Sequence, residues 1–399
     1  MNQQQQSKNS YGWPIALIIG FMCLIAMSDA LKGVFIPVFK QVFKVENTEM
    51  GFLLTVSSIG YIVGTYFCGH LCDKYGQKKI IIAGGSMMII ALPLIVMSSS
   101  YYMLLFGLLI MNFGAAFIAL GINTLIPLIM VSFQAVLMNF VHFAYGFGST
   151  LTQLKVGALI YDGVSWQTIY IGMGIFACSL VVLSFFIKIP VVEKAEVHKP
   201  ISKKELFKNP LLYTYILCLG FYVCAEMAIG SWFINYLKEV FAFNEKSSGL
   251  YSAMFFGGLT IGRLFGGFIT EKIGYIKTVN ICLGVNMILF PIGILLKING
   301  IYLISLTGLF CSIVFPTVIL TVSYVFKETK TYATGIIVTL VSTMAMMGNM
   351  LIGFINDKIS VSFGFSIIGV FYALSFLASL YIYKSKGVEI EKQRRGIIT

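Results

Sequence analysis

The sequence predicts an all-α membrane protein with twelve transmembrane helices in two pseudo-symmetric six-helix bundles, and three observations support this fold class. First, 58% of the 399 residues are hydrophobic and only 11% are charged, with a mean hydropathy of +0.89. Soluble domains average about 45–50% apolar and about 25% charged residues, so a water-soluble fold cannot bury this much apolar surface. Second, the apolar residues form continuous runs, which favours helices over a closed barrel. Third, each crossing takes roughly 20 residues, so this length accommodates twelve.

Polar interruptions divide the apolar sequence into the twelve predicted spans. They cover residues 13–39, 48–71, 78–97, 101–128, 134–160, 166–188, 211–237, 246–270, 276–297, 300–326, 331–355 and 361–384. The first ten residues are polar and no cleavage site follows the first apolar run, so no signal peptide is expected. The loop after the sixth span is long and rich in charge. We therefore expect a six-helix bundle over residues 1–189, a cytoplasmic linker over 190–210, and a second six-helix bundle with a basic tail over 211–399.

The distribution of basic residues predicts the orientation in the membrane. Nineteen of the 28 Lys and Arg residues fall in the loops and termini of one side and six in those of the other, while Lys32, Lys155 and Arg263 lie inside spans. Cytoplasmic loops carry the excess of positive charge, so both termini are expected in the cytoplasm, with the protein in the plasma membrane. Topology accounts for the net charge of +12, and no nucleic-acid partner is expected.

A charged loop motif occurs twice. Residues 69–79 read GHLCDKYGQKK and residues 267–277 read GFITEKIGYIK, and both fit G-x-x-x-(D/E)-K-x-G-x-x-K. The pattern suits a tight cytoplasmic turn in which the carboxylate caps a neighbouring helix or pairs across the half. Two copies in corresponding places indicate internal duplication, which in membrane proteins is typical of transporters. The positions expected to act in gating or in structure are Gly69, Asp73, Lys74, Gly76 and Lys78, then Gly267, Glu271, Lys272 and Gly274.

Twelve spans in six-plus-six order, with this motif in both halves, make the chain resemble the major facilitator superfamily. Within it the chain is similar to the fucose/proton symporter family. The segments that carry this similarity are 36–43 (IPVFKQVF), 139–142 (NFVH) with Gly146 and Gly148, 222–226 (YVCAE) with Trp232 and Tyr236, 262–266 (GRLFG) and 315–317 (FPT). The resemblance implies alternating access by rocking of two halves around a sugar site at the membrane midplane, with proton symport.

Ionisable groups inside spans are costly, so each is a functional candidate. Asp29 is expected to take up and release the proton, or else to form an internal ion pair with Lys32, three residues on. Compared with the resembled family, this carboxylate stands one turn early, with Gly33 in the usual place. Glu226 is the strongest candidate for proton coupling, and the family's polar sugar-contacting position maps onto it. Arg263 is expected to be structural.

Polar side chains of span five are the main candidates for substrate binding. Asn139, His142 and Tyr145 recur every three residues and so share a helix face. The family's amide positions that contact sugar fall on His142 and Tyr145. His142 titrates near neutral pH, which suits sugar binding, proton relay or both, with a structural hydrogen bond as the alternative. Lys155 lies further along and either binds substrate or extends toward the membrane surface.

Four further polar residues complete the predicted binding set. Asn123 stands where the family carries a second acid before a proline, so either proton coupling has moved or there is none. Trp232 offers an apolar face for a sugar ring, with Asn235 beside it. Asn349 lies on a span expected to line the cavity. For Asn123 the alternative role is a hydrogen bond to a neighbouring helix.

No enzymatic activity is expected, because no catalytic constellation stands out. The sequence has no phosphate-binding loop for ATP, and its eight cysteines lack metal-site spacing. We expect no cofactor or metal, a proton gradient as the driving force, and a monomer that binds a small molecule in a lipid bilayer. The predicted function is sugar transport. Three alternatives remain open: an organic-anion importer or exchanger that uses Lys32 and Lys155, multidrug efflux, and a nutrient sensor without transport.

Overall fold

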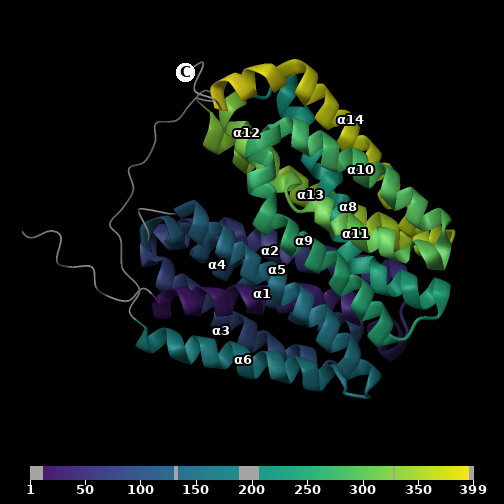
Figure 1. The fold of residues 1–399 in the computed structure, drawn as a ribbon. Helices are drawn as coiled ribbons and strands as arrows, with labels where there is room; N and C mark the ends of the chain where they lie inside the picture. The colour runs from purple at the N-terminus through teal and green to yellow at the C-terminus, as the bar shows by residue number, and fades with distance from the viewer. Residues whose placement is uncertain (1–11, 130–133, 188–205, 327–328, 395–399) are drawn as a thin grey trace, which may run out of the picture. The chain divides into compact units, whose positions relative to one another are not determined.

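The computed structural model describes residues 12–129, 134–187, 206–326 and 329–394, and helices dominate these residues (Figure 1). Most of the predicted linker lies outside the described residues. The helices are α1 (Gly12–Phe43), α2 (Asn47–Tyr75), α3 (Gln77–Val96), α4 (Tyr101–Ile129), α5 (Gln134–Tyr161), α6 (Trp166–Phe186), α8 (Pro210–Phe241), α9 (Glu245–Ile273), α10 (Tyr275–Leu295), the 3₁₀ turn η1 (Lys297–Gly300), α11 (Ile301–Cys311), α12 (Val314–Val325), α13 (Lys330–Lys358) and α14 (Val361–Arg394).

The predicted all-α membrane architecture is confirmed. Within the described ranges, eleven helical stretches are long and apolar enough to cross a membrane. The remaining predicted span corresponds to α5, which has 28 residues and is not among these eleven. It carries polar side chains such as His142, Gln153 and Lys155, and such groups are costly inside a membrane.

The helices group into two compact units, and the first comprises Met1–Asp29, Val56–Ser149 and Val164–Glu196. Here α3 packs against α4 and α6. Glycines permit close approach: a Cβ at Gly84 would lie 2.5 Å from the carbonyl oxygen of Gly114. Cys68, Cys72 and Phe117 form a small apolar cluster near the end of α2. The buried glycines therefore act as packing points, as small residues do in membrane helix pairs.

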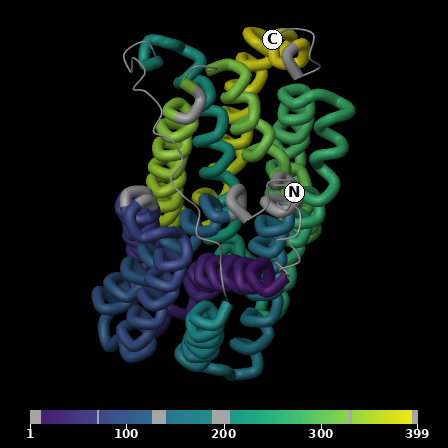
Figure 2. The backbone as a smooth tube through the Cα atoms, turned by 90° about the vertical axis from the view of Figure 1, so that its left-hand side faces the viewer, coloured from purple at the N-terminus to yellow at the C-terminus, as the bar shows by residue number. Residues whose placement is uncertain are grey.

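The second unit comprises Ala30–Thr55, Thr150–Gly163 and Val197–Thr399. In it α8 lies against α13 and α14, α9 lies against α11, and α10 lies against α14. Figure 2 shows these teal to yellow helices running alongside one another. The unit also includes the C-terminal parts of α1 and α5 and the start of α2, so three helices of the first half of the sequence contribute to it.

The predicted tenth span is broken in the middle. It consists of α11 and α12, which are separated at Ser312 and Ile313. Pro316 explains the break, because it lacks a backbone N–H and its ring clashes with the carbonyl group four residues earlier, that of Ser312. The broken segment fits against glycines of α9, where a Cβ at Gly262 would lie 2.7 Å from the carbonyl oxygen of Leu309.

Both copies of the loop motif form tight turns between two helices. Gly76 (φ 83°) separates α2 from α3, and Gly274 (φ 107°) separates α9 from α10. Positive φ angles favour glycine, which explains why the motif has glycine at this position. In the first copy the Lys78 ammonium group donates to the carbonyl oxygen of Ile187, 2.8 Å away, and Lys74 lies over the Tyr75 ring. The side chain of Asp73 lies outside the described part of the structure. For Gly69, only its helical backbone is described.

The second copy is capped from a distant helix. Glu271 accepts a hydrogen bond from the Tyr275 hydroxyl at 2.8 Å, whereas the backbone N–H of Tyr275 donates to Glu391 of α14, also at 2.8 Å. Lys272 and Gly267 are exposed. The carboxylate that caps α10 thus comes from the C-terminal tail rather than from the motif itself.

Candidate functional site

In the first unit, α1 and α5 bring two of the predicted site residues together. The Tyr145 hydroxyl donates to an oxygen of Asp29 at 2.8 Å. Both side chains are half-buried, as is that of His142, one turn before Tyr145 on α5. The side chain of Asn139 is not among those described. A carboxylate paired with a phenol can exchange a proton and can also accept a hydrogen bond from a solute hydroxyl in place of the phenol.

Asn123, on α4 of the same unit, offers an unused acceptor. Its side chain is half-buried, and its Oδ1 atom is buried without a hydrogen-bond partner in the described part of the structure. A buried amide oxygen without a partner is costly, so a hydroxyl donor there would be favourable.

In the second unit, Glu226 of α8 pairs with Arg263 of α9. The nearest oxygen and nitrogen atoms are 3.8 Å apart, and the side chains are 12% and 23% exposed. This is an ion pair and not a hydrogen bond, because the distance exceeds hydrogen-bond length. The sequence pointed to each residue separately. It did not predict that they pair. The signal that could have predicted the pair is the presence of opposite charges at similar depth in two consecutive spans.

A polar network beside this pair was not predicted. The Tyr222 hydroxyl donates to the carbonyl oxygen of Cys311 at 2.7 Å, the Cys311 sulfur lies 3.2 Å from the Tyr372 hydroxyl, and the Asn286 amide donates to the same sulfur at 3.3 Å. The Oδ1 atom of Asn286 is buried without a partner among the described residues. Cys311 is therefore a hydrogen-bonding centre, although its sequence context suggested only an apolar filler.

Three other residues that were predicted to contact substrate are buried between packed helices. Trp232 is 1% exposed, and a Cβ at Gly353 would lie 3.2 Å from its ring. Asn235 is fully buried and donates to Oδ1 of Asn47 at 3.1 Å. Asn349 is buried on α13 and its Oδ1 atom has no partner in the described ranges. Substrate contact by these residues stays a prediction.

The predicted lysines differ from each other, and Gly33 has a packing role. Lys32 is half-buried on α1, whereas Lys155 is exposed on α5. A Cβ at Gly33 would overlap the carbonyl oxygen of Gly230 on α8. A carboxylate at position 33 is therefore incompatible with this helix crossing, which gives a physical reason for the earlier position of Asp29.

The described residues contain no group of three His, Cys, Asp or Glu side chains that could hold a metal ion. All eight cysteines are free thiols. The polar groups of the candidate site residues are carboxylates, amides, hydroxyls, one imidazole and a few cations. This set suits hydrogen bonding to a hydroxylated solute and proton exchange.

Comparisons with known proteins agree with this architecture. The family model of the Major Facilitator Superfamily matches residues 17–304 and 224–396. The Helicobacter pylori protein named "Putative glucose/galactose transporter" is 28% identical over 233 residues, which cover 55% of this chain and 56% of the relative, so the chain spans about half the length of that curated protein.

Two solved structures share the fold at low identity. A D-xylose-proton symporter has a TM-score of 0.76 at 14% identity, covering 93% of this chain and 97% of that one. The Escherichia coli fucose:proton symporter has a TM-score of 0.64 at 19% identity, covering 93% and 99%. With eleven helical stretches in the described ranges apolar enough to cross a membrane, and a family match over most of its length, the chain belongs to the Major Facilitator Superfamily.

Proposed function

We propose that this protein is a secondary active transporter that moves a sugar or sugar-like solute across the plasma membrane by alternating access, coupled to protons. The observation that carries the proposal is the half-buried Glu226–Arg263 pair inside transmembrane helices. Charged residues at membrane depth are rare and serve ion and solute pathways. The names of the compared proteins, a glucose/galactose transporter and sugar-proton symporters, support a sugar as the solute.

In this proposal the Glu226 carboxylate carries the coupled proton. While the carboxylate is ionised, Arg263 compensates its charge. Protonation removes the negative charge and leaves the guanidinium without its counter-ion, so the two protonation states favour different arrangements of α8 and α9.

The same proposal assigns solute binding to the hydrogen-bonded Asp29 and Tyr145 of α1 and α5. Asp29 and Tyr145 would contact solute hydroxyls, with His142 one turn away and Asn123 supplying a free acceptor oxygen. Sugars present several hydroxyls that both donate and accept, so a set with carboxylate, phenol, imidazole and amide groups suits them. Both termini are proposed to be cytoplasmic, and the transporting species is proposed to be a monomer.

The test is uptake into proteoliposomes with D-glucose, D-galactose, D-xylose and L-fucose as probes, with and without an inward proton gradient. Glu226→Gln keeps the shape of the side chain but cannot titrate. We expect this variant to lose accumulation driven by the gradient while it retains exchange of labelled for unlabelled solute. Glu389→Gln is the matched control, because Glu389 forms a partly exposed ion pair with Lys386 near the end of α14. Gradient-driven accumulation by Glu226→Gln at the control's level would refute the coupling role.

An organic-anion transporter is the second candidate. It is favoured by the half-buried Lys32 on α1 together with Arg263, two cations at membrane depth. The same vesicles distinguish the two candidates. In an organic-anion transporter, uptake of a carboxylate solute would not be inhibited by any of the sugars, and it would be lost in Lys32→Ala.

A further inference from the structure

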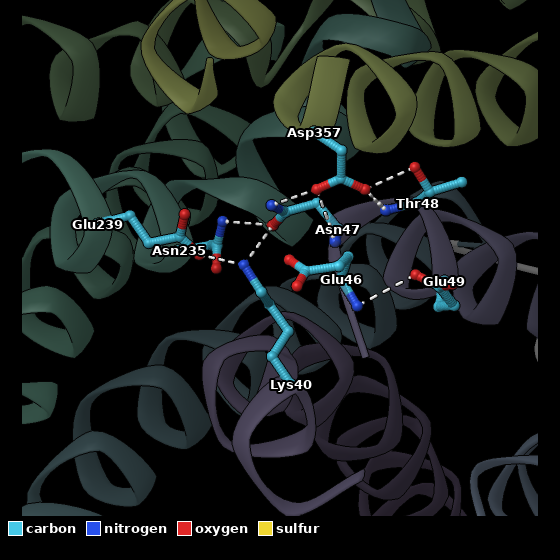
Figure 3. Close-up of polar contacts among 8 residues, drawn as sticks. All are labelled: Lys40, Glu46, Asn47, Thr48, Glu49, Asn235, Glu239 and Asp357. Atoms are coloured by element: carbon cyan, nitrogen blue, oxygen red, sulfur yellow. Dashed lines mark hydrogen bonds and ion pairs between the residues drawn. The ribbon is translucent and has the colours of Figure 1, made fainter. Parts of the chain in front are cut away.

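One end of the second unit holds a polar cluster that joins helices from both halves of the sequence (Figure 3). Its centre is the carboxylate of Asp357, near the C-terminal end of α13. The backbone N–H and the side-chain amide of Asn47 donate to Oδ1 at 3.0 and 2.8 Å. The backbone N–H and the hydroxyl of Thr48 donate to Oδ2, each at 2.6 Å. Asp357 thus accepts four hydrogen bonds from the first two residues of α2.

Asn47 connects this carboxylate to a second set of contacts. Its Oδ1 atom accepts from the Lys40 ammonium group at 2.9 Å and from the Asn235 amide at 3.1 Å. Lys40 in turn forms an ion pair with Glu239 of α8. Figure 3 shows the Lys40 side chain reaching up between Asn47 and Glu239. The cluster therefore links α1 and α2 to α8 and α13 through side chains and through two backbone N–H groups of α2.

The capping of α2 depends on this contact. The first backbone N–H groups of a helix have no partner within the helix and need an acceptor. Just before α2, the N–H of Glu46 donates to the Glu49 carboxylate of the same helix at 3.0 Å. The N–H groups of Asn47 and Thr48 are satisfied from α13. For Asp357 itself, a negative charge in the last turn of its own helix is unfavourable, and its position at the start of α2 offsets that cost.

Glycines let the same helices approach closely behind the cluster. A Cβ at Gly353 of α13 would lie 2.5 Å from the carbonyl oxygen of Asn47, and a Cβ at Gly51 of α2 would lie 3.1 Å from that of Asn349. Gly33 of α1 meets Gly230 of α8. Short side chains such as those of Asn47 and Thr48 can therefore span the gap between helices, since small residues bring backbones together.

We propose that Lys40, Asn47, Thr48, Asn235, Glu239 and Asp357 form an outer latch, which holds the outer ends of α1 and α2 against α8 and α13 and must open for solute to enter from that side. The charge pattern of the loops predicts this end to be extracellular. The inference rests on the alternating access of the proposed function. The latch stabilises the arrangement with these helix ends joined, so its loss favours the arrangement with them apart.

A neighbouring ion pair provides a matched control. Lys238 pairs with Glu245, and this pair joins α8 to α9, two helices of the same half. It lies next to Glu239 in the sequence, at the same end of the helices. Its loss removes one partly buried ion pair without releasing α1 or α2.

The first experiment is hydrogen–deuterium exchange on the purified full chain without solute. In Asp357→Ala, exchange at the amides of Asn47 and Thr48 should become roughly 2- to 30-fold faster, which is the range for losing a capping side chain. Asp357→Asn keeps one acceptor and should fall between Asp357→Ala and the parent. Glu239→Gln should speed exchange in residues 40–48 by roughly 2- to 5-fold. Glu245→Gln should leave residues 40–48 at the parent's rate.

The second experiment measures access from outside. Ser231→Cys places a thiol on α8 beside Gly33, and the rate of its labelling by a membrane-impermeant maleimide is compared with the parent, which has only the native cysteines. Adding Asp357→Ala or Thr48→Val should speed labelling several-fold, whereas adding Glu245→Gln should not. Neither readout needs a solute, so failure of the sugar proposal leaves the latch intact. If the exchange rates and labelling rates of the latch variants equal those of Glu245→Gln, the outer latch is wrong. If Asp357→Ala does not fold, Thr48→Val and Glu239→Gln provide the same comparison.

Discussion

At the residue scale, Asp29 and Glu226 are carboxylates in transmembrane helices with two different kinds of partner. Asp29 accepts a hydrogen bond from a neutral phenol, whereas Glu226 faces a guanidinium group. A neutral donor can be exchanged for a solute hydroxyl without leaving a charge behind, but an arginine cannot, because an unpaired buried charge is costly. This difference is why we assign solute contact to the Asp29 pair and proton coupling to the Glu226 pair.

Tyr145→Phe tests the first assignment. It removes the hydroxyl that donates to Asp29 and keeps the ring. In the proposed site this hydroxyl turns from Asp29 to a hydroxyl of the solute. A hydrogen bond between neutral groups contributes about 0.5–1.5 kcal/mol, so losing it should raise KM for the transported sugar roughly 2- to 10-fold. Steady-state uptake at several concentrations measures this. Tyr161→Phe, an exposed tyrosine at the end of α5, is the control, and an unchanged KM in Tyr145→Phe would remove the Asp29 pair from the binding site.

Sequence reasoning could identify these residues but not their pairing. Asp29, Glu226 and Arg263 are visible because charges are rare in apolar runs. Which charges meet depends on helix crossings that bring together residues far apart in the chain, such as Asp29 and Tyr145. The network around Cys311 gave no charge signal at all, since it consists of a thiol, an amide and two phenols.

At the element scale, two helix N-termini depend on carboxylates from other helices. Asp357 of α13 caps α2, and Glu391 of α14 caps α10. The loop motif predicted the turns before α3 and α10 correctly, because glycine with charged neighbours is a local signal. It did not predict the acceptor at α10, which lies more than one hundred residues away in the sequence. Capping from a distant helix has no local pattern, so it becomes visible only in the structure.

The two motif glycines allow a test of this capping arrangement. An alanine at Gly76 or Gly274 has to adopt positive φ with an extended ψ, a region that is essentially restricted to glycine, which costs about 1–3 kcal/mol. A Cβ at Gly76 meets no atom within 4 Å, whereas one at Gly274 would lie 2.7 Å from Oε1 of Glu391. Gly274→Ala should therefore lower the Tm of the purified protein more than Gly76→Ala. Adding Glu391→Ala should reduce the difference, because it removes the overlap. Equal losses for the two glycine variants would contradict the proposed contact with Glu391.

At the scale of the whole molecule, the duplicated sequence and the compact units divide the chain differently. The sequence predicts two halves on either side of residues 190–210. By contrast, the second unit takes in residues 30–55 and 150–163 from the first half. Hydropathy identifies spans because each one is a local property, whereas contact between the halves depends on where glycines such as Gly33 and Gly51 meet the opposite backbone. The two six-helix halves therefore stay a prediction from the duplicated sequence. The compact units describe which helices are in contact in this structure.

Gly33→Leu tests whether the close crossing of α1 and α8 matters for that state. A leucine there would overlap the carbonyl oxygen of Gly230, so α1 has to move away from α8 and the outer latch loses its backing. We expect exchange in residues 40–48 to become faster and sugar uptake to fall, while the helical circular dichroism stays at the parent's level. Gly172→Leu is the matched control, because a Cβ at this exposed position on α6 meets no atom within 4 Å. Uptake and exchange in Gly33→Leu equal to those of Gly172→Leu would mean that the crossing is not needed for transport, and the outer latch would then have to act without it.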